Sequence, residues 1–250
     1  MYDRNSFILS ESPLKRDLLK LFKNDEPITI LDIGGCEGED SVRYSKLFPK
    51  SSIFVFEPLS QNKKIILENF ERYNVKNAEL LNIALSDVKG QQDFYVSSGH
   101  PSDKKNDEVW DFGNKSSSLL PPGRVNEIVP WLKFENTISV TTETLENFIN
   151  DRKIASVDFV HMDVQGAELK VLAGAGKSIK KIKAIWLEVS DLPLYKDQPL
   201  RNDVQKFMKE NGFYRVKKQE NDEMYLNSYW YKTISFFFLK MHFKKNLIAV

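Results

Sequence analysis

The sequence has little cysteine, little net charge and no long apolar run. Its 250 residues include one cysteine, Cys36, and carry a formal net charge of +1. A single cysteine excludes an intrachain disulfide framework and every zinc motif built from several cysteines. Without a global basic field, no nucleic-acid partner is expected. No apolar stretch is long enough to span a bilayer and the N-terminus lacks a signal-peptide core, so we expect a cytoplasmic protein.

The chain does contain a regular alternation of strand-like and helix-like segments. Hydrophobic residues make up 41% of it, which suits the core of a single domain over residues 1–250. Alternating strands and helices predict an α/β fold with a Rossmann-like, doubly wound and mostly parallel sheet. A lead-in helix is expected within residues 1–25. Strands are expected at residues 28–33, 51–57, 78–87, 91–97, 138–141, 157–164 and 184–189, followed by a helix from 202 and paired strands at 212–216 and 224–229.

Two segments interrupt this order. Residues 98–136 are rich in small and polar residues but also hold isolated aromatics, so we interpret them as an insertion that can act as a lid over the acceptor site. The tail, residues 229–250, is apolar with interspersed basic residues. It is expected to cover the core or to form a homo-oligomer contact, and a weak membrane-surface contact is the alternative.

A glycine-rich corner follows the strand at residues 28–33. Asp32 ends the strand, and Gly34, Gly35 and Gly38 form the turn before a helical segment. A carboxylate here would repel a pyrophosphate, so the corner suits a nucleoside ligand with a cationic amino group and no phosphate, such as S-adenosyl-L-methionine. A tight packing turn is the alternative, because glycine turns are common in α/β folds.

Two further residues follow strands of the same sheet. Glu57 ends the strand at residues 51–57 and lies at the spacing expected of an acid that accepts both hydroxyls of a ribose. Solvation alone also places acids at strand ends. Asn82 can pair with the exocyclic amine of adenine or simply cap a turn.

The sequence resembles the FkbM-type S-adenosylmethionine-dependent methyltransferases, over roughly residues 28–190. The resemblance implies a seven-stranded class I methyltransferase fold and methyl transfer to a hydroxyl, often of a sugar or glycan precursor. The family usually has Asp-Val-Glu-Gly-Ala-Glu where this chain has Gln165 in place of the first Glu, and His161 stands where Lys is common. The segments that carry the resemblance are Leu31-Asp32-Ile33-Gly34-Gly35, Val55-Phe56-Glu57-Pro58, Asn82-Ile83-Ala84-Leu85-Ser86-Asp87, Ser117-Ser118-Leu119 and Met162-Asp163-Val164-Gln165-Gly166-Ala167-Glu168.

The resemblance also implies where the cofactor lies. The glycine corner would hold its amino-acid part, Glu57 its ribose and Asp163 its reactive methyl. The implied cofactor-binding residues are Asp32, Gly34, Gly35, Gly38, Glu57, Asn82, Ala84 and Asp163.

Methyl transfer to oxygen needs a group that takes the hydroxyl proton. Asp163 is the first candidate base, Glu188 the second and His161 the third. A structural role in closing a turn is the alternative for Asp163, and an interior histidine is the alternative for His161. A divalent metal on these three residues is conceivable but not favoured.

Gln165, Ser118 and Tyr195 are the candidate substrate residues, and the acceptor is expected to be a small molecule or a glycan. Glutamine can orient a hydroxyl but cannot take its proton. A catalytically weak cofactor-binding protein is therefore one alternative function. A NAD-type oxidoreductase on the same kind of sheet is the other.

Overall fold

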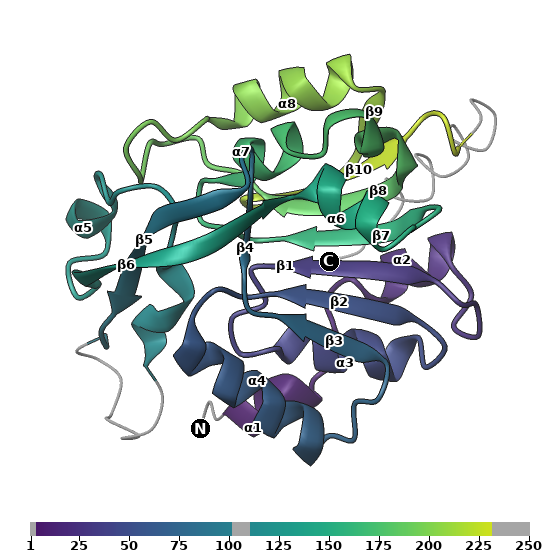
Figure 1. The fold of residues 1–250 in the computed structure, drawn as a ribbon, viewed down its shortest axis with the longest axis horizontal. Coiled ribbons are helices and arrows are strands. Elements are labelled where there is room, and N and C mark those ends of the chain that lie inside the picture. The colour runs from purple at the N-terminus through teal and green to yellow at the C-terminus, as the bar shows by residue number, and fades with distance from the viewer. Residues whose placement is uncertain (1–3, 102–110, 232–250) are drawn as a thin grey trace.

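The computed structural model describes residues 4–101 and 111–231, and a seven-stranded sheet forms its centre (Figure 1). The strand order is β3-β2-β1-β7-β8-β10-β9. The first five strands are parallel, and β10 runs antiparallel to both β8 and β9. The predicted mostly parallel α/β sheet is confirmed. Its strands are β1 (Thr29–Ile33), β2 (Ser52–Phe56), β3 (Ala78–Leu81), β7 (Val157–Met162), β8 (Ile182–Glu188), β9 (Phe213–Gln219) and β10 (Asp222–Asn227).

Helices cover both faces of this sheet. Successive residues of a strand face opposite ways, and the two cores reflect this. Ile30 and Phe159 pack with α1 to α4, whereas Leu31 and Val160 pack with α6 to α8. The sheet is therefore doubly wound. The helical segments are α1 (Arg4–Leu9), α2 (Lys15–Leu21), α3 (Glu39–Leu47), α4 (Ser60–Arg72), η1 (Phe112–Ser116), α5 (Val125–Ile128), α6 (Leu145–Asp151), α7 (Glu168–Ala173), η2 (Gly176–Lys181) and α8 (Arg201–Glu210).

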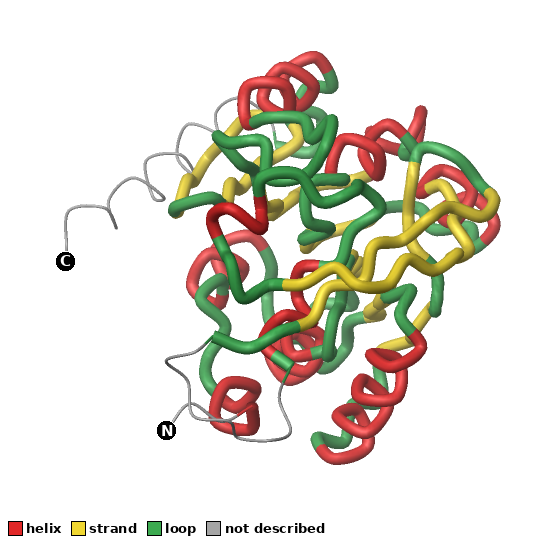
Figure 2. Tube along the Cα trace, turned by 90° about the vertical axis from the view of Figure 1, so that its left-hand side faces the viewer, coloured by secondary structure: helices red, strands yellow, loops and turns green. Residues whose placement is uncertain are grey.

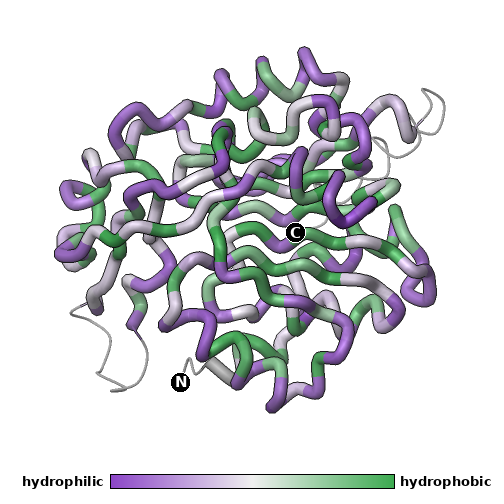
Figure 3. The backbone as a smooth tube through the Cα atoms, in the orientation of Figure 1, coloured by the Kyte–Doolittle hydropathy of each residue, from purple (hydrophilic) through white to green (hydrophobic). Residues whose placement is uncertain are grey.

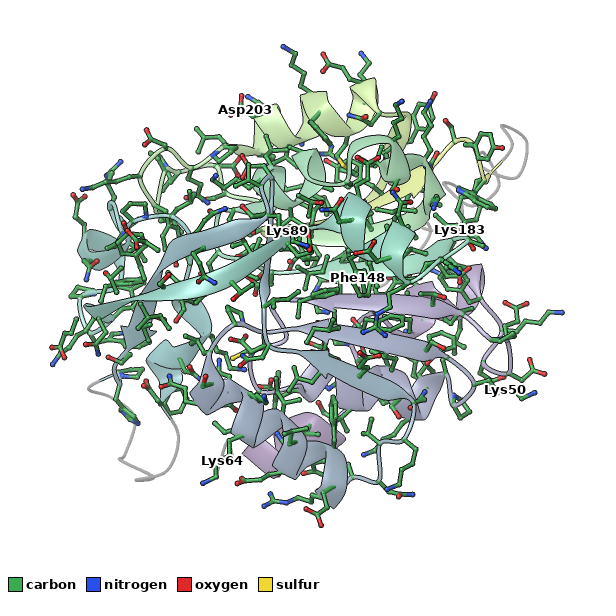
Figure 4. The ribbon with its side chains drawn as sticks, viewed as in Figure 1. Lys50, Lys64, Lys89, Phe148, Lys183 and Asp203 are labelled. Atoms are coloured by element: carbon green, nitrogen blue, oxygen red, sulfur yellow. The ribbon has the colours of Figure 1, made fainter. Side chains whose placement is uncertain are left out.

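Hydropathy follows this layering. Figure 3 shows hydrophobic backbone along the central strands and hydrophilic backbone on outer helices and turns. In Figure 4, Lys50 and Lys64 project from the rim, whereas Phe148 lies inside the outline. The ring of Phe148 meets Phe54 and Phe56 edge-on, with centroids 5.3 and 4.9 Å apart. These contacts fix α6 against β2.

A smaller sheet lies beside the first, with the order β4-β6-β5. Its strands are β4 (Ala84–Ser86), β5 (Gly90–Ser98) and β6 (Lys133–Thr144). Figure 2 shows the long β5–β6 ribbon in yellow along one side of the molecule. The prediction of one strand over residues 78–87 is wrong, since that segment divides between the two sheets. At the break, Asn82 Nδ2 donates to the carbonyls of Glu57 and Pro58, at 2.8 and 2.9 Å, which turns the chain out of the first sheet.

The lead-in region differs from the prediction of one helix, and the insertion is described only in part. The lead-in region forms two short helices, because Pro13 follows Ser12 and the Ser12 hydroxyl accepts from the Leu14 amide between them. Within 98–136 the structure shows η1, α5 and the start of β6, while residues 102–110 lie outside the described part, so the lid remains a prediction.

Residues 232–250, most of the predicted tail, also lie outside the described part. The oligomer and membrane-surface roles of that tail therefore remain predictions. Across residues 4–101 and 111–231, no helix has the length and apolar character needed to cross a membrane.

Candidate functional site

A pocket opens where the carboxyl ends of β1, β2 and β7 meet the smaller sheet. Such strand ends are where open α/β sheets bind ligands. The space between the lining residues, with open solvent at the mouth included, is about 530 Å³. The lining residues are Ile33, Gly34, Cys36, Phe56, Glu57, Pro58, Leu59, Asn62, Ala84, Leu85, Phe94, Asn114, Lys115, Ser117, Leu119, Asp163, Val164 and Gln165.

Glu57 lies in the pocket wall with its carboxylate fixed by the backbone. Its Oε2 accepts from the Cys36 amide at 3.0 Å and its Oε1 accepts from the Leu59 amide at 2.9 Å. Burial raises the pKa of Glu57 to about 7, although these hydrogen bonds oppose the shift. A hydrogen bond from the Asn62 side chain is a third partner. A carboxylate has about four acceptor positions, so Glu57 can still accept a hydrogen bond from a ribose hydroxyl.

The glycine corner is needed for packing. Gly34 has a φ of +86°, and a Cβ there would lie 1.9 Å from the Asp163 carbonyl oxygen. A Cβ on Gly35 would lie 2.3 Å from a methyl carbon of Val55. Both amides donate to the Phe56 carbonyl, at 3.0 and 3.1 Å. Gly38, with a φ of +78°, begins α3. The packing alternative thus holds for Gly34 and Gly35, and Gly34 also lines the pocket; a role of the corner in holding a ligand remains a prediction.

Asp32 and Asn82 lie behind the pocket wall. Asp32 is 4% exposed and accepts a hydrogen bond from the Ser41 hydroxyl, and burial raises its pKa to about 6. The Asn82 amide braces the turn after Glu57, as the turn alternative expects, while Ala84 lines the pocket on that side. Contact of Asp32 or Asn82 with a cofactor remains a prediction.

Gln165 joins two carboxyl groups at the end of β7. Its Nε2 donates to Asp163 Oδ1 at 2.7 Å and to Glu188 Oε2 at 2.9 Å. The Tyr195 hydroxyl lies 3.0 Å from Gln165 Oε1. A φ of +53° at Gln165 turns the side chain into this position. The structure therefore brings four of the predicted site residues together.

The Asp163 carboxylate lies close enough to Glu188 to change the protonation of Glu188. The charge of Asp163 and, next, burial raise the pKa of Glu188 to about 10. Glu188 is therefore protonated near neutral pH. Asp163 lies at the pocket, exposed to solvent, where a general base would be useful.

His161 and Ser118 are placed elsewhere. The His161 ring lies against α3, with Nδ1 3.0 Å from the Tyr44 hydroxyl, and it is not part of the Asp163–Glu188 pair. Ser118 is fully buried; its hydroxyl donates to the Gln165 carbonyl and accepts from the Leu120 amide. Ser118 thereby holds the turn that carries Gln165. Within the described residues, no group of three or more His, Cys, Asp or Glu is arranged to hold a metal ion.

Two pocket residues, and one buried acid outside the pocket lining, were missed by the sequence analysis. Asn114 Nδ2 donates to Asn62 Oδ1 at 2.8 Å, and Lys115 Nζ lies 2.6 Å from Glu39 Oε1. Asn114 and Lys115 come from the insertion, where no periodicity marks them. Glu168 ends the Asp-Val-Gln-Gly-Ala-Glu motif and accepts from the Val164 and Gly166 amides, both at 3.2 Å. Burial raises its pKa to about 7.

Cys36 begins the turn before α3, where a thiol can be acidified by a helix N-terminus. Here burial, followed by the charge of Glu39, raises the pKa of the thiol well above its ordinary value. Its side chain is therefore a packing element of the pocket wall.

The chain matches a known family model and resembles several known methyltransferases. The family model described as the methyltransferase FkbM domain matches residues 32–214. The 2-O-methyltransferase NoeI of Sinorhizobium fredii is 34% identical over 193 residues, which are 77% of this chain and 75% of NoeI. Methyltransferase 1 of Beauveria bassiana is 23% identical over 147 residues, 58% of this chain and 57% of that protein.

Among solved structures, an rRNA methylase of Streptococcus thermophilus matches with a TM-score of 0.45 at 10% identity, over 88% of this chain and 98% of that chain. The family match spans the glycine corner, Glu57 and the Gln165 cluster.

Proposed function

Because the chain belongs to the FkbM methyltransferase family, we propose that it transfers a methyl group from S-adenosyl-L-methionine to a hydroxyl of a small molecule or glycan. The predicted family is confirmed by the match over residues 32–214. The name of NoeI, a 2-O-methyltransferase, supports oxygen as the acceptor atom. The observation that carries the proposal is a single pocket with the Glu57 carboxylate in one wall and Asp163 in another.

The pocket residues fit this cofactor in their chemistry. Ala84, Leu85 and Phe94 give an apolar wall for a flat base, and Glu57 can accept a hydrogen bond from a ribose hydroxyl. Among the lining residues that the structure describes, Lys115 is the one cation, and it is paired with Glu39. That charge distribution suits a phosphate-free nucleoside and argues against the pyrophosphate of the NAD-type alternative.

The bound cofactor would supply an electrophilic methyl group on its sulfonium. Asp163, which lines the pocket beside Glu188, would take the proton of the acceptor hydroxyl as the carbon–oxygen bond forms and the methyl–sulfur bond breaks, which would leave S-adenosylhomocysteine. Gln165 would keep Asp163 in position through its 2.7 Å hydrogen bond. Alignment of the acceptor oxygen with the methyl group supplies much of the acceleration in such transfers.

Gln165 need not be a base in this scheme. Its amide NH₂ is engaged by two carboxyl groups, and the proton goes to Asp163. The weak-enzyme alternative is therefore distinguished by measurement: it predicts cofactor binding without methyl transfer.

Calorimetry with S-adenosylhomocysteine and with NAD tests the binding step, and mass spectrometry of a panel of glycans tests methyl transfer. We expect binding of the first ligand alone and a product heavier by one methylene group. Asp163→Asn should lower turnover about 10²- to 10⁴-fold, whereas Asp93→Asn, on the exposed face of β5, should leave it unchanged. Tight binding of NAD, or equal turnover by Asp163→Asn, would contradict the proposal.

A further inference from the structure

One buried oxygen in the pocket has no hydrogen-bond partner. Asn114 of η1 is 6% exposed and lines the pocket, and its Oδ1 has no partner among the residues that the structure describes. The other end of the same amide is satisfied, because Nδ2 donates to Asn62 Oδ1. Buried polar groups are nearly always hydrogen-bonded, so an unpaired acceptor in a pocket wall indicates a donor on a ligand.

The backbone around Asn114 is held firmly. The Gly113 amide donates to the Gly99 carbonyl at 2.8 Å, and the Tyr195 hydroxyl donates to the Ser116 carbonyl at 2.7 Å. A Cβ on Gly113 would lie 2.2 Å from the carbonyl carbon of Ser98, so this segment packs tightly against β5. The unpaired oxygen therefore belongs to a built wall of the pocket.

Asn114 is also connected to Glu57. Asn62 accepts from Asn114, and a hydrogen bond with Asn62 lowers the pKa of Glu57 against the effect of burial. One chain of polar groups thus runs from Glu57 through Asn62 to Asn114. An amide oxygen accepts and cannot donate, so its partner must be an O–H or N–H and cannot be a phosphate or carboxylate oxygen.

We propose that Asn114 Oδ1 accepts a hydrogen bond from a ribose hydroxyl of the bound nucleoside, beside Glu57. The inference rests on the proposed function, because the ribose is that of the methyl donor. The insertion, predicted to cover the acceptor site, then also contributes a residue to the cofactor site.

Calorimetry tests this with two ligands, S-adenosylhomocysteine and its 2′,3′-dideoxy analogue. Asn114→Ala should weaken binding of the first ligand about three- to tenfold. The analogue lacks the ribose hydroxyls, so its affinity should be the same for Asn114→Ala and for the unaltered protein. Asn114→Asp keeps an acceptor oxygen at this position and should retain discrimination between the ligands. Asn126→Ala is the matched control in the same insertion, because the Asn126 amide donates to the Leu132 carbonyl and lies outside the pocket lining.

The outcomes separate the inference from the proposed function. Failure of the unaltered protein to bind S-adenosylhomocysteine overturns both. Normal binding by Asn114→Ala overturns the inference alone. Equal weakening of both ligands by Asn114→Ala also overturns it, because a purely structural role of Asn114 would not distinguish them. Each variant is measured with both ligands, because a general loss of protein stability would change the two affinities by the same factor.

Discussion

Gln165 lies between the carboxyl groups of Asp163 and Glu188 at the end of β7. Its Nε2 donates to both Asp163 and Glu188. Glutamic acid at this position would replace two donor interactions by a third carboxyl group. We therefore expect Gln165→Glu to lower the free energy of unfolding by about 1–3 kcal/mol and to lower turnover, although the resembling family usually has Glu here.

Urea unfolding and turnover with a glycan acceptor that the unaltered protein methylates measure the two effects. Gln219→Glu, at the exposed end of β9, is the control for adding a carboxylate elsewhere. An increase of turnover in Gln165→Glu would show that the position serves as a base, and our assignment of the proton to Asp163 would then be incorrect.

The pKa of Glu57 lies in a pH range where the affinity for a ligand can be measured. Its pKa is raised to about 7, chiefly by burial. The ionised carboxylate is the better acceptor for ribose hydroxyls. We expect adenosine, which carries the ribose and has no group titrating nearby, to bind about tenfold more tightly at pH 8 than at pH 6 as the ionised fraction rises.

Glu57→Gln should bind adenosine more weakly and with the same affinity at both pH values. Calorimetry at pH 6 and pH 8 measures this directly. Persistence of the pH dependence in Glu57→Gln would assign it to another group, of which Asp32, with a pKa raised to about 6, is the nearest candidate.

At the scale of elements, strands with a strong local pattern were predictable. The apolar runs of β1, β2 and β7 marked strands, and acids and glycines at their ends marked the pocket, because parallel strands end at a common edge. The division at Asn82 was not predictable, since its amide bonds to the backbone of Glu57 and Pro58, about 25 residues earlier.

The same limit applied to the site. Glu57, Gly34, Ala84, Asp163 and Gln165 line the pocket, and their contact with a cofactor or substrate stays a prediction. Asn114 and Lys115 reach it only because their segment packs on β5, which no local pattern in the sequence expresses. The role of Ser118 was not predictable from a local pattern either, because its buried hydroxyl donates to the carbonyl of Gln165, which is distant in the sequence.

The packing of η1 on β5 should control cofactor affinity. Ser97 is fully buried; its hydroxyl donates to the Gly113 carbonyl and accepts from the Ser116 amide at 3.1 Å. Ser97→Ala should loosen this wall and weaken binding of S-adenosylhomocysteine about three- to tenfold, as expected for loss of buried hydrogen bonds.

Calorimetry gives the affinity, and limited proteolysis with and without ligand shows whether residues 98–136 are protected by binding. Ser139→Ala, at an exposed position of β6, is the control. Unchanged affinity in Ser97→Ala would mean that this wall tolerates loss of its anchor.

At the scale of the whole molecule, several acidic residues lie near the ends of the strands, and their pKa values are raised there. Burial raises the pKa of both Glu57 and Glu168 from 4.5 to about 7, and of Asp32 and Asp222 to about 6. The folded chain therefore binds protons more tightly than the unfolded chain in this range. A site designed around carboxylates thus costs stability when those carboxylates ionise.

The sign of the effect follows from proton binding. Where the folded state holds more protons than the unfolded state, the free energy of unfolding falls as pH rises. For Glu57 and Glu168 that interval runs from pH 4.5 to about 7, and each contributes about 3 kcal/mol as an upper bound. Surface acids whose pKa is lowered by ion pairs, such as Asp87 beside Lys170, lose their contribution to stability only below pH 4 and do not offset the trend.

Urea unfolding of the ligand-free protein should therefore show lower stability at pH 8 than at pH 5.5, and Glu168→Gln should reduce that difference. Stability that rises over this interval would mean that the carboxylates are already ionised and paired in the folded protein, contrary to the burial seen at the strand ends.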